Sequence, residues 1–108
     1  MRVLLVEDED VIAELTTLVL LIEGHTFDVA PDSYAALDMF ENHGPYDVVL
    51  SDECHPGLSG TELAKVIREI NPTQPIGFLT CCEIEGFPRL FRPCEMSEIP
   101  PFLNSLVA

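Results

Sequence analysis

Short apolar runs alternate with helical patterns along this chain, and this alternation is what most limits its fold. Apolar runs cover residues 2–6, 26–30, 48–50 and 75–79. The first three are each followed by apolar residues three or four positions apart, the spacing of a helix that packs on one side. Repeated strand–helix units imply right-handed crossovers and a parallel sheet with helices on both faces. The 108 residues therefore predict one α/β domain spanning 1–108.

Local signals place the ends of the expected helices. The first helix starts near Val11 and ends before Gly24, and Asp32 or Ser33 caps the second. The third runs to Asn71-Pro72. Two prolines, Pro100 and Pro101, fit only in the first turn of a last helix over 99–107, and residues 89–92 allow a very short strand before it.

The expected strands end on polar residues that a parallel sheet brings to one edge. Glu7 and Asp8 follow the first strand, Asp52 follows the third and Thr80 the fourth. Neighbouring carboxylates repel one another and raise one another's pKa, and a bound hard divalent cation offsets that repulsion. Mg²⁺ is usually held by one or two carboxylates plus a phosphate. The set therefore predicts a Mg²⁺ site at which Asp52 accepts a phosphoryl group, with the Thr80 hydroxyl donating to a phosphoryl oxygen.

The charge balance favours some partners over others. With 19 acidic against 5 basic side chains the formal net charge is −14, which disfavours nucleic acid and anionic membranes as partners. No signal-peptide pattern or membrane-length apolar run is found, so we expect a cytoplasmic protein whose four cysteines are thiols.

The chain resembles the receiver domains of response regulators in two-component signalling. The resemblance rests on residues 3–9 at the first strand, on Asp52 with Pro56-Gly57 and Gly60 after the third, and on 75–80 at the fourth. It implies a flavodoxin-like, doubly wound parallel sheet with strand order 2-1-3-4-5. It also implies phosphoryl transfer to the chain from a histidine kinase or a phosphotransfer protein.

The same resemblance assigns roles to individual residues. Asp52 is similar to the phosphoacceptor, and Glu7 and Asp8 to the acidic pair at the Mg²⁺ site. The backbone carbonyl of Cys54 would be the remaining protein ligand, and Thr80 the switch hydroxyl that the phosphorylated carboxyl draws inward.

The chain departs from the family pattern after Thr80. Receivers usually place a lysine before a proline at the end of the fifth strand, whereas this chain has Arg92-Pro93, and arginine is not a simple substitute for an ammonium. The segment from Thr80 to Arg92 is also shorter than the resemblance to receivers leads us to expect. We therefore expect a missing or reduced fourth helix and a short fifth strand. In a second alignment residues 87–92 are loop alone.

Two functions remain open at this point. The first is a single-domain response regulator phosphorylated on Asp52, without a fused output domain because the chain ends soon after its last helix. The second is a phosphorylation-independent interaction module on the same scaffold, with a metal or redox site in which thiolate and imidazole ligands suit zinc. The residues considered for that site are Cys54, His55, Cys81, Cys82 and Cys94. His55 itself is expected to be a solvent-exposed loop residue.

Overall fold

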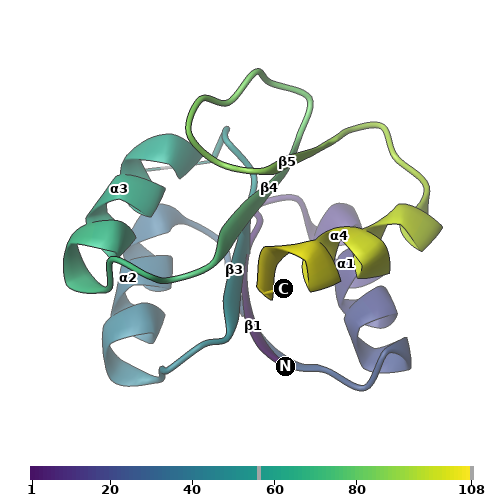
Figure 1. Ribbon diagram of the computed structural model, residues 1–108, viewed down its shortest axis with the longest axis horizontal. Coiled ribbons are helices and arrows are strands. Elements are labelled where there is room, and N and C mark those ends of the chain that lie inside the picture. Colours follow the sequence, from purple (N-terminus) through teal and green to yellow (C-terminus); the bar gives the residue numbers. More distant parts are fainter. Residues whose placement is uncertain (56, 108) are drawn as a thin grey trace.

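A five-stranded parallel sheet forms the middle layer of the protein (Figure 1). The structure is a computed structural model that describes residues 1–55 and 57–107. The strand order β2-β1-β3-β4-β5 confirms the predicted order. The strands are β1 (Arg2–Val6), β2 (Thr26–Ala30), β3 (Val48–Ser51), β4 (Ile76–Thr80) and β5 (Arg89–Phe91).

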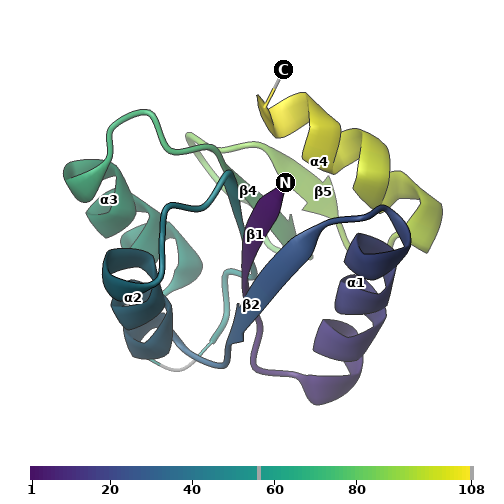
Figure 2. The same cartoon turned by 90° about the horizontal axis from the view of Figure 1, so that it is seen from below.

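Helices cover both faces of the sheet, with α2 and α3 on one side and α1 and α4 on the other (Figures 1 and 2). Each side has its own buried cluster, because alternate residues of the central strands point to opposite faces. Leu4 and Val6 belong to the α2/α3 cluster, whereas Val3 and Leu5 belong to the α1/α4 cluster. The helices are α1 (Asp10–Ile22), α2 (Ser33–Asn42), α3 (Gly60–Ile70) and α4 (Ile99–Val107), and a 3₁₀ turn, η1 (Met96–Glu98), precedes α4.

Side chains cap the starts of α2 and α3. The Asp32 carboxylate accepts the backbone N–H of Ala35 at 2.8 Å and so caps α2. Ser59 and Glu62 form a capping box at the start of α3. Pro100 and Pro101 lie in the first turn of α4, where a missing N–H costs nothing.

The segment between β4 and β5 contains no helix among its described residues, 81–88. Two apolar side chains from this loop, Ile84 and Phe87, instead pack against the α2/α3 cluster. The Phe87 ring meets Phe78 edge-on with 5.6 Å between centroids, and the Arg68 guanidinium lies 5.4 Å from the Phe87 centroid. The expected loss of the fourth helix is confirmed, and β5 is only three residues long.

Many of the apolar residues that predict α1 face solvent. Val11, Leu15, Leu18 and Ile22 fall on one helix face and are 45–75% exposed, whereas Thr16 and Leu20 are the buried positions. We call these four residues the α1 stripe. No helix in the described part of the chain is long and apolar enough to cross a membrane.

The contribution of α3 to the core is testable with two isoleucines on the same helix. Ile67→Ala should lower the free energy of unfolding by about 2–4 kcal/mol, because it leaves a cavity at a fully buried position. Ile70→Ala, at a position 49% exposed, should change it by less than about 1 kcal/mol. Urea unfolding followed by circular dichroism measures both, and equal losses would contradict the packing described.

Candidate functional site

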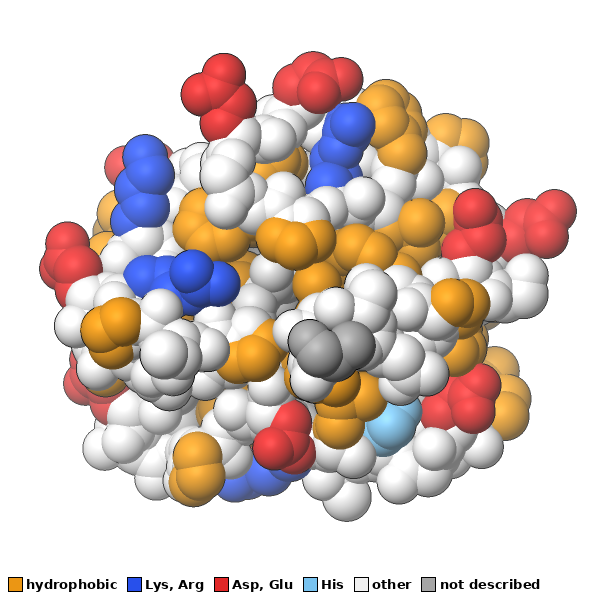
Figure 3. All heavy atoms as spheres, viewed as in Figure 1, with side chains coloured by type: hydrophobic (Ala, Val, Ile, Leu, Met, Phe, Trp, Pro, Cys, Tyr) orange, Lys and Arg blue, Asp and Glu red, His pale blue; other side chains and the backbone are white. Residues whose placement is uncertain are grey.

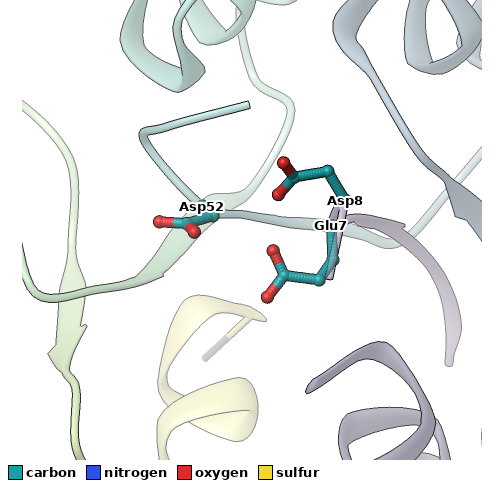
Figure 4. Close-up of side chains that lie close together, drawn as sticks. All are labelled: Glu7, Asp8 and Asp52. Carbon is teal, nitrogen blue, oxygen red and sulfur yellow. The ribbon is translucent and has the colours of Figure 1, made fainter. Parts of the chain in front are cut away.

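Three carboxylates meet at the carboxyl ends of β1 and β3. Glu7 and Asp8 follow β1, Asp52 follows β3, and the ladder pairs Val6 with Ser51, so the two strand ends are level. One oxygen from each carboxylate lies within 4.8 Å of the others. Figure 4 shows Glu7 and Asp8 projecting from the end of β1 toward Asp52. The structure thus brings together the acidic residues that the strand ends predicted, and we call them the acidic cluster.

Backbone contacts hold Asp52 in place. Its N–H donates to the Val6 carbonyl at 3.2 Å, and its Oδ1 accepts the Glu53 N–H at 2.7 Å. The Glu53 carbonyl in turn accepts the N–H of Gly60, the first residue of α3, at 2.8 Å. A Cβ on Gly60 would collide with the Asp52 carbonyl oxygen, so this close approach requires glycine.

Arg92 pairs with two of the three carboxylates in the acidic cluster. Its Nη1 donates to Glu7 Oε1 at 3.0 Å, and its Nη2 contacts Asp52 Oδ2 at 3.1 Å and the Leu79 carbonyl at 2.6 Å. The Arg92 N–H also bonds the Thr80 carbonyl at 3.0 Å, which extends the β4–β5 pairing and aims the side chain. The guanidinium reaches these acceptors through two nitrogens of one planar fork, a geometry that the compact ammonium of lysine lacks.

Glu7 is buried, with only 4% of its surface exposed. Burial raises the pKa of its carboxyl above the ordinary value of 4.5, the Arg92 hydrogen bond and charge oppose this, and the charges of Asp52 and Asp8 add to it. Its second oxygen, Oε2, is buried and has no hydrogen-bond partner within the described residues. A buried carboxylate oxygen of this kind needs a cation or a proton, so the donor set fits a hard divalent cation.

Thr80 and a surface hollow complete the surroundings of Asp52. Thr80 is buried at the end of β4, and its hydroxyl accepts the Cys82 N–H at 3.2 Å. A hollow of about 340 Å³ opens onto Asp52 and is lined by Glu9, Ile12, Asp52, Cys81, Arg92 and Pro93. Glu9 is the N-terminal flanking residue of α1 and lies in the wall of this hollow.

The positions of the cysteines and His55 do not support a zinc site. Among described residues, the acidic cluster is the group of three or more His, Cys, Asp or Glu side chains with metal-ligand spacing, and no thiol joins it. Cys54 and Cys82 instead lie with their sulfur atoms 3.8 Å apart, and this hydrogen bond and the Cys82 charge raise the pKa of the Cys54 thiol. His55 is half-buried rather than exposed, since its Nε2 lies 3.3 Å from the Ser51 hydroxyl.

A parallel α/β sheet with an acidic cluster, a buried hydroxyl and a basic side chain at its carboxyl edge defines a class of phosphoacceptor domains rather than classical enzymes. Residues 3–86 match the response regulator receiver domain model, and the chain belongs to this family of two-component signalling proteins. The acidic cluster is typical of the Mg²⁺ site of receivers.

Curated relatives are transcriptional regulators of greater length. The chain is 36% identical over 92 residues to the alkaline phosphatase synthesis transcriptional regulatory protein SphR of Synechococcus elongatus, which covers 78% of this chain and 36% of SphR. It is 40% identical over 79 residues to the transcriptional regulatory protein CseB of Streptomyces avermitilis, covering 73% and 33% respectively. The chain thus spans about a third of the length of these relatives.

Solved receiver structures share the whole fold. The receiver domain of the hybrid histidine kinase CckA is 28% identical, with a TM-score of 0.89 and full coverage of both chains. The response regulator TrrA of Thermotoga maritima, solved in complex with Mg²⁺ and BeF, is 30% identical, with a TM-score of 0.88 and 97% coverage of each chain.

The raised pKa of Glu7 gives stability a defined pH dependence. Between 4.5 and the higher folded value, the folded state binds more protons than the unfolded state, so the stability that protonated Glu7 contributes is lost as pH rises. Glu7→Gln does not titrate. Its free energy of unfolding should therefore rise relative to the native chain between pH 4 and pH 7, by about 1.4 kcal/mol for each tenfold gain in proton affinity that folding gives Glu7. Urea unfolding at several pH values, in buffer containing a metal chelator, measures the difference in free energy of unfolding between Glu7→Gln and the native chain. A difference that shrinks as pH rises would refute the raised pKa.

Removal of Arg92 should leave the acidic cluster uncompensated. Arg92→Met should lower the free energy of unfolding by about 3 kcal/mol, the lower end for breaking a buried ion pair, because Arg92 and Asp52 are each nearly a fifth exposed. Lys65→Met removes the same charge from an exposed position on α3 and should cost less than about 0.5 kcal/mol. Equal losses in urea unfolding would show that only net charge matters.

Proposed function

We propose that the protein is a response regulator that accepts a phosphoryl group on Asp52 from a phosphohistidine of a histidine kinase or phosphotransfer protein, in a Mg²⁺-dependent reaction. One observation carries the proposal: Asp52 opens onto a surface hollow, lies within metal-ligand spacing of Glu7 and Asp8, and is paired with Arg92. The assignment of 1–108 to a single receiver domain, and of single-domain action, stays a prediction made from the sequence.

The chemistry is a displacement at phosphorus. An oxygen of the Asp52 carboxylate forms the new P–O bond as the P–N bond to the histidine breaks, and the imidazole leaves with the electron pair. Oδ1 already accepts the Glu53 N–H, so the carboxylate is oriented before the donor arrives. Positioning and charge compensation supply most of the catalysis in such transfers.

Charge compensation is divided between a cation and Arg92. Glu7, Asp8 and Asp52 would hold a Mg²⁺ ion, which would supply positive charge beside the transferring group. The Cys54 backbone carbonyl is the fourth ligand that the family pattern suggests. In other receivers the lysine ammonium pairs with the phosphoryl group. Arg92 takes this role here, since its Nη2 already lies 3.1 Å from Asp52 Oδ2 and can pair with the phosphoryl oxygens.

Signal output begins at Thr80. Its hydroxyl is free to donate a hydrogen bond while it accepts the Cys82 N–H, so a phosphoryl oxygen on Asp52 offers it a new acceptor. A shift of Thr80 would move the loop that follows β4. Because this loop replaces a helix, we propose that residues 81–88 themselves present the phosphorylation-dependent surface.

The α1 stripe offers a surface for the phosphodonor protein. It belongs to the same helix as Ile12 and adjoins Glu9, and both residues line the hollow over Asp52. The face in Figure 3, whose middle is the β4–β5 region and α4 rather than α1, likewise carries apolar side chains over much of its middle and acidic ones mainly at its periphery. With a net charge of −14, the chain favours a partner that surrounds its own apolar contact with Lys and Arg.

Phosphorylation in solution tests the proposal directly. The chain is incubated with acetyl phosphate and Mg²⁺, and intact-mass spectrometry should show one phosphoryl adduct that Asp52→Asn abolishes. Asp8→Asn should raise the Mg²⁺ concentration for half-maximal rate about tenfold, equivalent to ~1.4 kcal/mol. Asp10→Asn, an exposed neighbour outside the acidic cluster, is the matched control and should behave as the native chain does.

Two results would contradict the proposal. An adduct that persists in Asp52→Asn would place the phosphoryl group elsewhere. A folded native chain that gains no adduct at any Mg²⁺ concentration would instead favour the phosphorylation-independent interaction module, for which the replaced lysine and missing helix are the structural argument.

A further inference from the structure

Two thiols lie in contact beside the proposed phosphorylation site. The Cys54 and Cys82 sulfur atoms are 3.8 Å apart, although the residues are 28 positions apart in sequence. Cys54 follows Asp52 by two residues in the loop after β3, and Cys82 follows Thr80 by two residues in the loop after β4. The contact therefore joins the two loops that carry the candidate phosphoacceptor and the candidate switch residue.

The strand pairing makes a covalent link between these loops feasible. β3 and β4 are adjacent and parallel, with Ser51 opposite Phe78, so both loops leave the same edge of the sheet. Adjacent strands are about 4.8 Å apart, within the Cα separation that disulfides span. The sulfur atoms need to approach by about 1.8 Å to reach bonding distance, a shift that two loops outside the strands can absorb.

The surroundings favour a disulfide over a metal site. Among described residues, no third His, Cys, Asp or Glu side chain joins this pair at metal-ligand spacing, and two thiolates alone do not satisfy a tetrahedral zinc ion. Cys54 is exposed and can meet a small oxidant, whereas Cys82 is half-buried. Exposure alone therefore makes Cys54 the thiol that meets the oxidant first and Cys82 the thiol that resolves the mixed disulfide.

We propose that Cys54 and Cys82 form a reversible disulfide that restrains the two loops and slows phosphorylation of Asp52. The oxidant is a low-molecular-weight disulfide such as oxidised glutathione. Cys54 attacks it and releases one glutathione thiol, and Cys82 then displaces the second, so two protein thiols and one glutathione disulfide become one protein disulfide and two glutathione thiols.

The restraint acts through the Cys82 backbone. The Cys82 N–H bonds the Thr80 hydroxyl at 3.2 Å, and the Cys82 carbonyl accepts Arg89 Nη1 at 2.9 Å. A disulfide would hold Cys82 against the loop after β3 and so keep its N–H on Thr80 Oγ1. Movement of Thr80 toward a phosphoryl group would then be opposed. This consequence rests on the proposed function, whereas the disulfide itself does not.

Thiol trapping tests the disulfide without any phosphodonor. The chain is equilibrated in glutathione buffers of increasing oxidised fraction, quenched with N-ethylmaleimide and weighed intact. Two of the four cysteines should escape alkylation, and peptide mapping should link Cys54 to Cys82. The Cys81→Ser/Cys94→Ser double variant should still form the link, and Cys82→Ser should not. Four alkylated thiols throughout, or a link through Cys81 or Cys94, would overturn the proposal.

Two further readouts test the restraint. In the oxidised chain the Cys82 amide should exchange with solvent about tenfold more slowly, because the loop opens less often. The initial rate of phosphorylation by acetyl phosphate should fall several-fold and recover with dithiothreitol, an effect that Cys82→Ser should lose. Unchanged amide exchange, or an unchanged rate in a chain that does phosphorylate, would overturn the restraint. A chain that shows the link and the slowed exchange but no adduct when reduced would contradict the proposed function alone.

Discussion

The site depends on the ion pairs that the Arg92 guanidinium makes with Glu7 and Asp52. Three carboxylates at one sheet edge repel one another, and Glu7 among them is buried. Arg92 pairs with Glu7 and Asp52 and also bonds the Leu79 carbonyl, which fixes the cation to the end of β4. The β1–β3 pairing brings the strand ends together, and the Arg92 side chain offsets the repulsion that this places on Glu7 and Asp52.

The same interaction explains how a shortened receiver can keep its site. Residues 81–88, between β4 and β5, contain no helix, yet Ile84 and Phe87 pack against the α2/α3 cluster and β5 still pairs with β4. These contacts return the chain to the sheet edge in a register that places Arg92 beside Asp52. The loop therefore keeps the basic residue in place while the outer surface that a helix would present is lost.

The sequence predicted the parts of the fold that depend on local pattern. The bounds of β1, β2 and α4 follow from apolar runs and from proline, and the meeting of Glu7, Asp8 and Asp52 follows from parallel strand ends. The family resemblance placed Arg92 at the position of the usual lysine, but local pattern predicts neither its contacts with Glu7 and Asp52 nor the contact of Cys54 with Cys82. Both depend on loops whose path is set by tertiary packing, such as that of Phe87, and no periodic signal encodes it.

The α1 stripe has a consequence for how the protein behaves at high concentration. Four apolar side chains on one helix face favour association between copies, and the formal charge of −14 on each copy opposes it. The range of that repulsion is set by salt, being about 30 Å at 0.01 M ionic strength and about 3 Å at 1 M. The acidic surface thus keeps the stripe available for a partner at low salt, and its protection weakens as ionic strength rises.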